Sequence, residues 1–243
     1  MPAFNHEKTI FNRVRPQYAR IAQLVQAIIS SHITPEGRID DVDALERDLR
    51  RYSLNVEAWA TAFWLRQDES LSRSIARDFK RVGLTVDPQS PVVRAAVERL
   101  HREQVDLIKT LPIDAGKKAQ DMARRAAMET GKRAEMLIDQ LRGMKPGYPE
   151  YAARRLARTE TAKAQAALVQ TQSSELGIKQ YVWRTVRDEA VRDSHAAMEG
   201  KVCDWDNPPE VEPGLRHHPG GIYNCRCYSE PLLPKVKKSI TPA

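Results

Sequence analysis

The hydrophobic pattern of this chain changes once, near Gly177. Before that residue, apolar side chains recur every three to four positions, which places them on one face of an α-helix. After it, the segment 178–186 alternates polar with apolar residues and is rich in β-branched and aromatic side chains, as strands are. From Gly200 onwards, prolines and glycines are frequent, and a second short strand is expected near Cys227. The pattern predicts a mostly α-helical protein with a small α+β module at its C-terminal end.

The helical part contains clear helix breaks and helix starts. The segment 34–37 (Thr-Pro-Glu-Gly) ends one helix, and Asp40 or Asp41 can cap the next one. The clearest internal break is 83–91, where two prolines and a glycine cannot continue a helix. Ser90 fits the N-cap of the helix that follows this break.

Two further breaks are expected in the middle of the chain. The segment 112–116 contains Pro112 and Gly116, and the segment 145–149 contains two prolines and a glycine. A short helix is expected at 191–198, beyond the first strand. The main helices are predicted at 17–30, 42–49, 56–64, 68–80, 93–108, 117–130, between 131 and 142, and at 150–173.

These breaks divide the chain into four predicted segments. Residues 1–90 form an N-terminal helical region, and residues 91–176 form a second helical part. Residues 177–234 form the small α+β module, and residues 235–243 form a basic tail. We therefore expect an elongated helical body and a short-stranded end that carries cysteines and histidines.

Composition excludes several classes of protein. Charged residues make up 29 % of the 243 residues and aromatic residues only 6 %, which suits a helix-rich protein with thin cores. No apolar run approaches the roughly 18–20 residues that cross a bilayer. The first residues also lack the basic and apolar regions of a secretory signal. We expect a protein without a membrane anchor that is made in a cytoplasm.

The formal net charge of +7 favours acidic partners, such as nucleic acid or an acidic face of another protein. The basic residues are spread through the predicted helices and often lie beside acidic ones, as in 48–51 and 77–81, which is typical of a solvated helix face. The short run 235–238 is basic without acidic neighbours. DNA is therefore expected only as a secondary partner.

All three cysteines lie near the C-terminal end, at positions Cys203, Cys225 and Cys227. Zinc binds cysteine sulfur and histidine nitrogen in tetrahedral sites, and such a site stabilises a loop-rich segment that has little core. We predict a structural Zn²⁺ site formed by the three cysteines and His195, with His218 as the alternative fourth ligand. Because Cys-x-Cys is not the usual Cys-x2-Cys knuckle, two alternatives stay open: free buried thiols, and a disulfide formed in an oxidising environment.

A second group of residues has the chemistry of an acid–base catalyst. Arg158 and Glu160 lie on one predicted helix, and Arg192 and His195 are three positions apart on another. An arginine that holds phosphate, together with a carboxylate and a histidine, is able to cleave a phosphodiester without a metal. Arginine–glutamate pairs that fix a helix in place look the same in sequence, and we favour that structural role. The sequence has no Gly-rich phosphate loop, Gly-x-Ser-x-Gly elbow or His-Glu-x-x-His motif.

Four motifs follow one another in the second half of the chain. They are 157–161 (Ala-Arg-Thr-Glu-Thr), 181–185 (Tyr-Val-Trp-Arg-Thr), 188–201, which contains Arg-x-Ser-His-x4-Gly, and 224–227 (Asn-Cys-Arg-Cys). In this order they resemble the phage Mu F-like minor head proteins, also called the phage head morphogenesis family. The resemblance covers roughly residues 92–234.

The resemblance implies a minor head (capsid) protein of a tailed phage or prophage, a structural protein and not an enzyme. Such a protein associates with the portal protein and other head proteins, and assists head assembly, DNA packaging or delivery. It would be found in the host cytoplasm during assembly and then in the virion head near the portal, with packaged DNA as a further partner. Two alternatives remain: a general DNA-binding virion protein, and a nuclease-like module, because the family module has been likened to small nuclease folds. In the second case Arg158, Glu160, Arg192 and His195 would be the catalytic residues.

Overall fold

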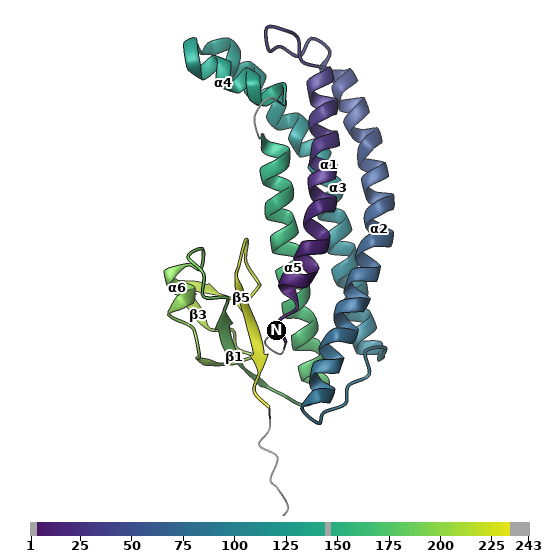
Figure 1. Cartoon of the computed structure of the whole chain (residues 1–243), viewed down its shortest axis with the longest axis vertical. Helices are drawn as coiled ribbons and strands as arrows, with labels where there is room; N and C mark the ends of the chain where they lie inside the picture. The colour runs from purple at the N-terminus through teal and green to yellow at the C-terminus, as the bar shows by residue number, and fades with distance from the viewer. Residues whose placement is uncertain (1–3, 144–146, 234–243) are drawn as a thin grey trace, which may run out of the picture. The chain divides into compact units, whose positions relative to one another are not determined.

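The computed structural model describes residues 4–143 and 147–233 (Figure 1). The described helices are α1 (Glu7–Ser31), α2 (Val42–Arg81), α3 (Pro91–Met128), α4 (Gly131–Leu141), α5 (Tyr148–Glu175) and α6 (Asp193–Ala196). The described strands are β1 (Gln180–Thr185), β2 (Val202–Asp204), β3 (Glu210–Glu212), β4 (Leu215–Arg216) and β5 (Cys227–Pro231). The predicted fold class, mostly α with a small α+β C-terminal module, is confirmed. The predicted basic tail, 235–243, lies outside the described residues, as does part of the predicted break at 145–149.

The chain forms two compact units, and three long helices contribute residues to both. The unit that we call the bundle unit consists of Glu7–Ser70 and Val97–Thr161. The unit that we call the module unit consists of Met1–His6, Leu71–Ala96 and Ala162–Ala243. The division of the chain at residues 90, 176 and 234 stays a prediction.

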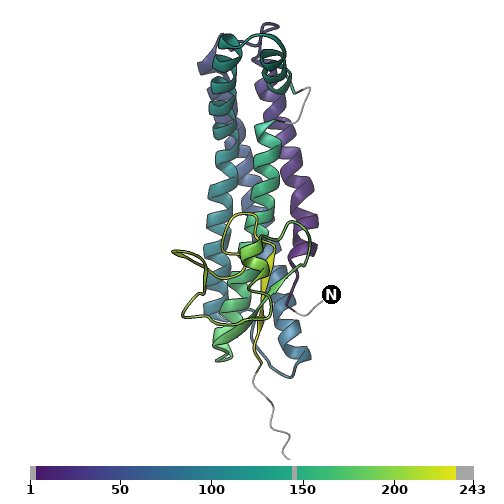
Figure 2. The same ribbon diagram turned by 90° about the vertical axis from the view of Figure 1, so that its left-hand side faces the viewer.

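The bundle unit is built from helices that run side by side in both views (Figures 1 and 2). Its core includes the fully buried Trp64, whose indole N–H donates a hydrogen bond of 2.9 Å to the Tyr18 hydroxyl. Burying both rings removes a large apolar area from water, and the hydrogen bond satisfies both polar groups. Trp59 is only half-buried and stacks on Phe63 with 4.7 Å between ring centroids.

The helices are longer than the sequence pattern predicts. Residues 42–81 form one helix of 40 residues, because this stretch contains neither proline nor glycine. The predicted break at Pro112 and Gly116 is wrong, since α3 continues through both residues. Gly116 is a packing residue: a Cβ atom there would lie 2.5 Å from Cδ1 of Leu49. The proline costs α3 one backbone hydrogen bond, and Leu111 and Ala115 beside it are buried.

Two predicted helix starts are confirmed. The Asp41 carboxylate accepts a hydrogen bond of 2.7 Å from the backbone N–H of Ala44, at the start of α2. The Ser90 hydroxyl accepts one of 3.2 Å from the N–H of Val93, at the start of α3. Each cap satisfies a backbone donor that has no partner within its own helix.

The module unit contains an antiparallel sheet with the strand order β2-β1-β5, and a separate β3–β4 hairpin. The predicted strand at 178–186 corresponds to β1, the strand near Cys227 to β5 and the short helix at 191–198 to α6. Alternate residues of β1 and β5 are buried, so one face of the sheet is part of the core. Trp183 lies opposite Ser229, and Thr185 lies opposite Cys227, on this buried face.

The N-terminal residues and the ends of α2 and α5 also belong to the module unit. The Phe4 ring lies 4.7 Å from the Phe79 ring, between centroids, and the Phe4 N–H donates to the Asp78 carboxylate at 2.8 Å. The Gln165 side chain donates to the Phe4 carbonyl at 2.5 Å.

Within residues 4–143 and 147–233, no helix combines the length and apolar character that a membrane span requires.

Candidate metal centre

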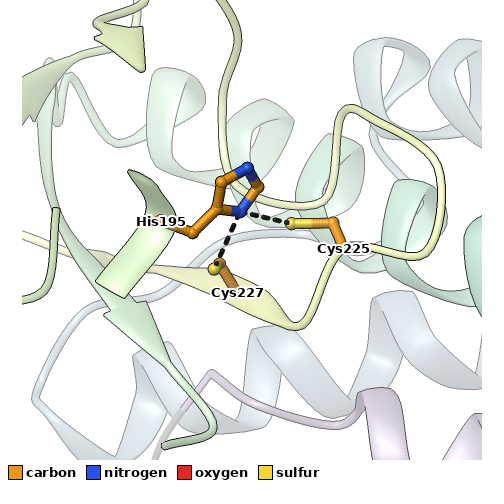
Figure 3. Close-up of side chains that lie close together, drawn as sticks. All are labelled: His195, Cys225 and Cys227. Carbon is orange, nitrogen blue, oxygen red and sulfur yellow. Dashed lines mark hydrogen bonds between the residues drawn. The ribbon is translucent and has the colours of Figure 1, made fainter. Parts of the chain in front are cut away.

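His195, Cys225 and Cys227 bring their side chains together in the module unit (Figure 3). The Nδ1 atom of His195 lies 3.6 Å from the Cys225 sulfur and 3.4 Å from the Cys227 sulfur. One donor atom from each residue lies within 4.8 Å of the others. The three residues are 1 %, 1 % and 4 % exposed, so the cluster is closed to bulk water.

The short helix α6 places His195 in the cluster. Arg192 has an extended backbone (φ −64°, ψ 147°) and forms the N-cap of α6, so the chain turns into the helix immediately before Asp193. The His195 ring then packs edge-on against Trp183 of β1, with 5.6 Å between centroids and planes 90° apart. The indole therefore fixes the orientation of the imidazole.

The turn before β5 places the two thiols. Asn224 adopts a left-handed backbone (φ 55°), which asparagine tolerates better than most residues. The chain then enters β5 at Cys227, two residues after Cys225. A spacing of two is the spacing at which side chains of an extended chain point to the same side.

Gly220 supports the Cys225 sulfur through its backbone. Its N–H donates a hydrogen bond of 3.3 Å to Cys225 Sγ. Gly220 has a φ of 81°, and a Cβ atom there would lie only 2.6 Å from the carbonyl oxygen of Ala162 on α5. Glycine is therefore required at this position for two reasons: its backbone conformation and its small volume.

The two thiols shift each other's pKa in opposite directions. The hydrogen bond from Cys227 lowers the pKa of Cys225 to about 4, and His195 and the Gly220 N–H act in the same direction. The same hydrogen bond, followed by burial, raises the pKa of Cys227. The two thiols therefore titrate as a unit, with Cys225 the more acidic of the two. A buried thiolate beside an imidazole is the donor chemistry that binds zinc.

Two of the predicted ligands lie outside this group. Cys203, on β2, pairs with Tyr181 across the sheet, and its thiol lies 3.8 Å from the carbonyl oxygen of Lys201. Burial raises the pKa of this thiol. His218, the alternative fourth ligand, has its Nδ1 atom 2.9 Å from the Tyr181 hydroxyl. The structure thus brings together three of the four residues predicted as the main ligand set.

The residues of the nuclease hypothesis are distributed over the two units. Arg158 lies in the bundle unit, where its Nη1 atom is 2.6 Å from Oε1 of Glu7 and its guanidinium lies 3.9 Å from the centre of the Phe11 ring. Glu160 is buried in the same unit. Arg192 and His195 belong to the module unit, where Arg192 donates to the carbonyl oxygen of Tyr223 at 2.9 Å. Arg158 thus pairs with Glu7, which the sequence did not single out, and the structural role expected for Arg158 and Glu160 stays a prediction.

Sequence reasoning missed a buried polar group in the bundle unit. The Asp68 carboxyl is 1 % exposed and is hydrogen-bonded to the side-chain amide of Gln104. Burial raises its pKa to about 8, and the nearby Glu160 acts in the same direction. Asp68 lies within a charged helical stretch, so no pattern in the sequence sets it apart from solvated acids.

Two comparisons with known proteins give matches. Residues 118–230 match the family described as "Phage Mu protein F like protein", which confirms the resemblance. An uncharacterized protein of Haemophilus influenzae is 34 % identical over 144 residues, which are 59 % of this chain and 31 % of that protein. The chain thus matches less than a third of the length of this relative. No solved structure matches the chain at a significant level.

Proposed function

Because residues 118–230 match the Phage Mu protein F-like family, we propose that this chain is a minor head protein of a tailed phage or prophage. Its role in this proposal is structural. It associates with the portal protein and other head proteins, and it assists head assembly, DNA packaging or delivery. The observation that carries the proposal is that the match includes all four motifs of the sequence and the whole His195–Cys225–Cys227 cluster.

Burial of the cluster supports a structural role over a catalytic one. His195 is 1 % exposed, and its Nδ1 atom faces two sulfur atoms. A general base must come within hydrogen-bond reach of the proton that it removes, and a phosphodiester in solution has no such access to this nitrogen. The guanidinium of Arg158 likewise forms an ion pair with Glu7, so it is not free to hold a phosphate.

Zn²⁺ is the metal that we propose for the cluster. Thiolate and imidazole donors select zinc or iron, and zinc has no redox chemistry that would disturb a purely structural site. The module unit contains short strands and long connections, for which an ion supplies stability that a small core does not. Zinc would therefore hold α6 and β5 together.

A basic face at the end of α2 supports an anionic partner. Arg73, Arg77 and Lys80 recur on one side of the helix and line a pocket of about 500 Å³, together with Val86 and Pro88. Residues at this spacing are neighbours on the helix surface. Such a face suits the phosphates of packaged DNA, which we propose as the secondary partner.

Deletion of the gene in the phage or prophage that encodes this chain tests the proposal. Heads purified from the parent should contain the chain, and heads from the deletion strain should be fewer or should lack DNA. The chain supplied from a plasmid should restore DNA-filled heads. Parent heads that lack the chain, together with unchanged head yield in the deletion strain, would overturn the proposal.

A further inference from the structure

The cluster of His195, Cys225 and Cys227 supplies three donors, which leaves one coordination position open. Structural zinc sites have four protein ligands in a tetrahedron, whereas catalytic sites keep one position for water or substrate. Since all three residues are almost completely buried, a fourth protein donor is needed inside the module unit.

His217 lies beside the cluster but outside the group whose donor atoms are within 4.8 Å of one another, so its ring must move to reach the open position. It directly follows β4, is 8 % exposed, and its ring centroid lies 5.2 Å from that of His195. Its Nδ1 atom lies 3.0 Å from the carbonyl oxygen of His218. A carbonyl only accepts hydrogen bonds, so Nδ1 carries the proton and Nε2 presents a lone pair. This is the outer hydrogen bond that orients a metal-bound histidine.

The lone pair of His217 meets no hydrogen-bond donor in the part of the chain that the structure describes. Nε2 of His217 is buried and is without a hydrogen-bond partner among the described residues. Leaving a buried polar atom unsatisfied costs about 1–3 kcal/mol, and a metal ion at this position would satisfy it. The rival donors both have partners already: Cys203 contacts the Lys201 carbonyl, and His218 contacts the Tyr181 hydroxyl.

The spacing of the other donors fits the size of a zinc tetrahedron. With a Zn–S bond of about 2.3 Å and a Zn–N bond of about 2.0–2.1 Å, the nitrogen-to-sulfur edge of a tetrahedron is about 3.6 Å long. The two observed distances from His195 Nδ1 to sulfur are 3.6 and 3.4 Å. The hydrogen bond from the Gly220 N–H to the Cys225 sulfur neutralises part of the charge that a second thiolate adds.

From these observations we infer that His217 is the fourth ligand, and that His195, His217, Cys225 and Cys227 form a closed four-coordinate zinc site. This inference rests on the Zn²⁺ site proposed above and replaces Cys203 and His218 with His217. The ion then joins three segments: α6, the end of the β3–β4 hairpin and the start of β5. With all four positions filled by protein atoms, the site stabilises the module and binds no substrate.

Cobalt substitution of the full-length protein tests the inference. Co²⁺ added to metal-free protein should bind one ion per chain, with the thiolate charge-transfer band and strong visible bands of a tetrahedral ion. The His217→Ala variant should bind Co²⁺ at least about 100-fold more weakly, beyond the 10–100-fold cost typical of an outer-shell change, with altered visible bands. The matched controls, His218→Ala and Cys203→Ser, should retain the affinity and spectrum of the parent.

A second variant separates loss of a ligand from loss of the fold. His217→Cys keeps a zinc donor, so it should bind Co²⁺ with a stronger charge-transfer band that reports a third thiolate. Parent-like affinity and spectrum in His217→Ala, or loss of binding in either control, would overturn the inference while the zinc site itself stands. A parent that binds no metal would overturn both the zinc site and the fourth ligand.

Discussion

At the scale of single residues, Gly220 connects the cluster to the rest of the module unit. Its N–H donates to the Cys225 sulfur, and its α-carbon lies too close to the Ala162 carbonyl for any side chain. A substitution there must either strain the backbone or move the sulfur. The proposed metal site therefore depends on a residue that is not one of its proposed ligands.

We expect Gly220→Ala to destabilise the protein more than Gly214→Ala. Both glycines have positive φ (81° and 74°), so alanine costs about 1–2 kcal/mol of backbone strain at each position. At Gly214 a Cβ atom would meet nothing within 4 Å, whereas at Gly220 it would clash with backbone. The clash should add about 1–3 kcal/mol to the loss of unfolding free energy in urea titrations. Equal losses in the two variants would contradict this placement of Gly220.

Asp68 is expected to make the protein less stable as the pH rises. Its pKa is raised to about 8 in the folded protein, against an ordinary value of 3.8. Between these two values the folded state binds more protons than the unfolded state, so the unfolding free energy falls with pH until about pH 8 and is independent of this group above it. Asp68→Asn should remove this dependence and stabilise the protein at pH 8 relative to the parent, with little difference near pH 4.

Urea titrations at pH 4, 6 and 8 measure that dependence directly. Asp121→Asn is a suitable control, because Asp121 forms an exposed ion pair with Arg124. If the parent and Asp68→Asn lose stability with pH at the same rate, the buried carboxyl is not the group that titrates.

At the scale of helices and strands, hydrophobic periodicity and helix caps were sufficient to predict much of the fold. Asp41 and Ser90 begin helices as predicted, because a cap is a local interaction between a side chain and the next turn. Strand β1 was likewise predicted from the alternation of polar and apolar residues along it. The continuation of α3 through Gly116 was not, since the close packing of Gly116 against Leu49 joins residues that lie far apart in the sequence.

The sequence predicted the type of candidate site, a cluster of cysteine and histidine side chains, but identified only some of its residues. The Cys-x-Cys pair and His195 come together as the sequence suggested. Spacing alone does not distinguish His217 from His218, because neighbouring residues on an irregular loop point in directions that only the fold determines. Nor does it show that Cys203 faces Tyr181 across the sheet.

The basic face of α2 leads to a prediction about DNA binding. Replacing Arg73, Arg77 and Lys80 with glutamine should weaken binding to duplex DNA. It should also reduce the slope of log affinity against log salt by up to about 0.9 for each phosphate contact that is lost. Arg47, Arg50 and Arg51, also exposed on α2, form a control triple with the same change in charge. Titrations at several salt concentrations should show the larger change for the first triple, and equal changes would indicate that only net charge matters.

At the scale of the whole molecule, the two units should differ in their dependence on metal. The cluster lies in the module unit, whereas the bundle unit has its own core around Trp64 and Tyr18. A zinc chelator should therefore lower the midpoint of one unfolding transition and leave most of the helical circular dichroism intact. Calorimetry with and without the chelator would measure this. A single transition that the chelator does not move would contradict a structural metal.

The function proposed for the whole protein depends on its partner. Native mass spectrometry of the chain, co-expressed with the portal protein of the same phage or prophage, tests that association most directly. We expect a discrete complex whose mass gives the number of chains per portal and includes one zinc ion for each chain. A chain that remains free beside assembled portal would contradict the proposed role in the phage head.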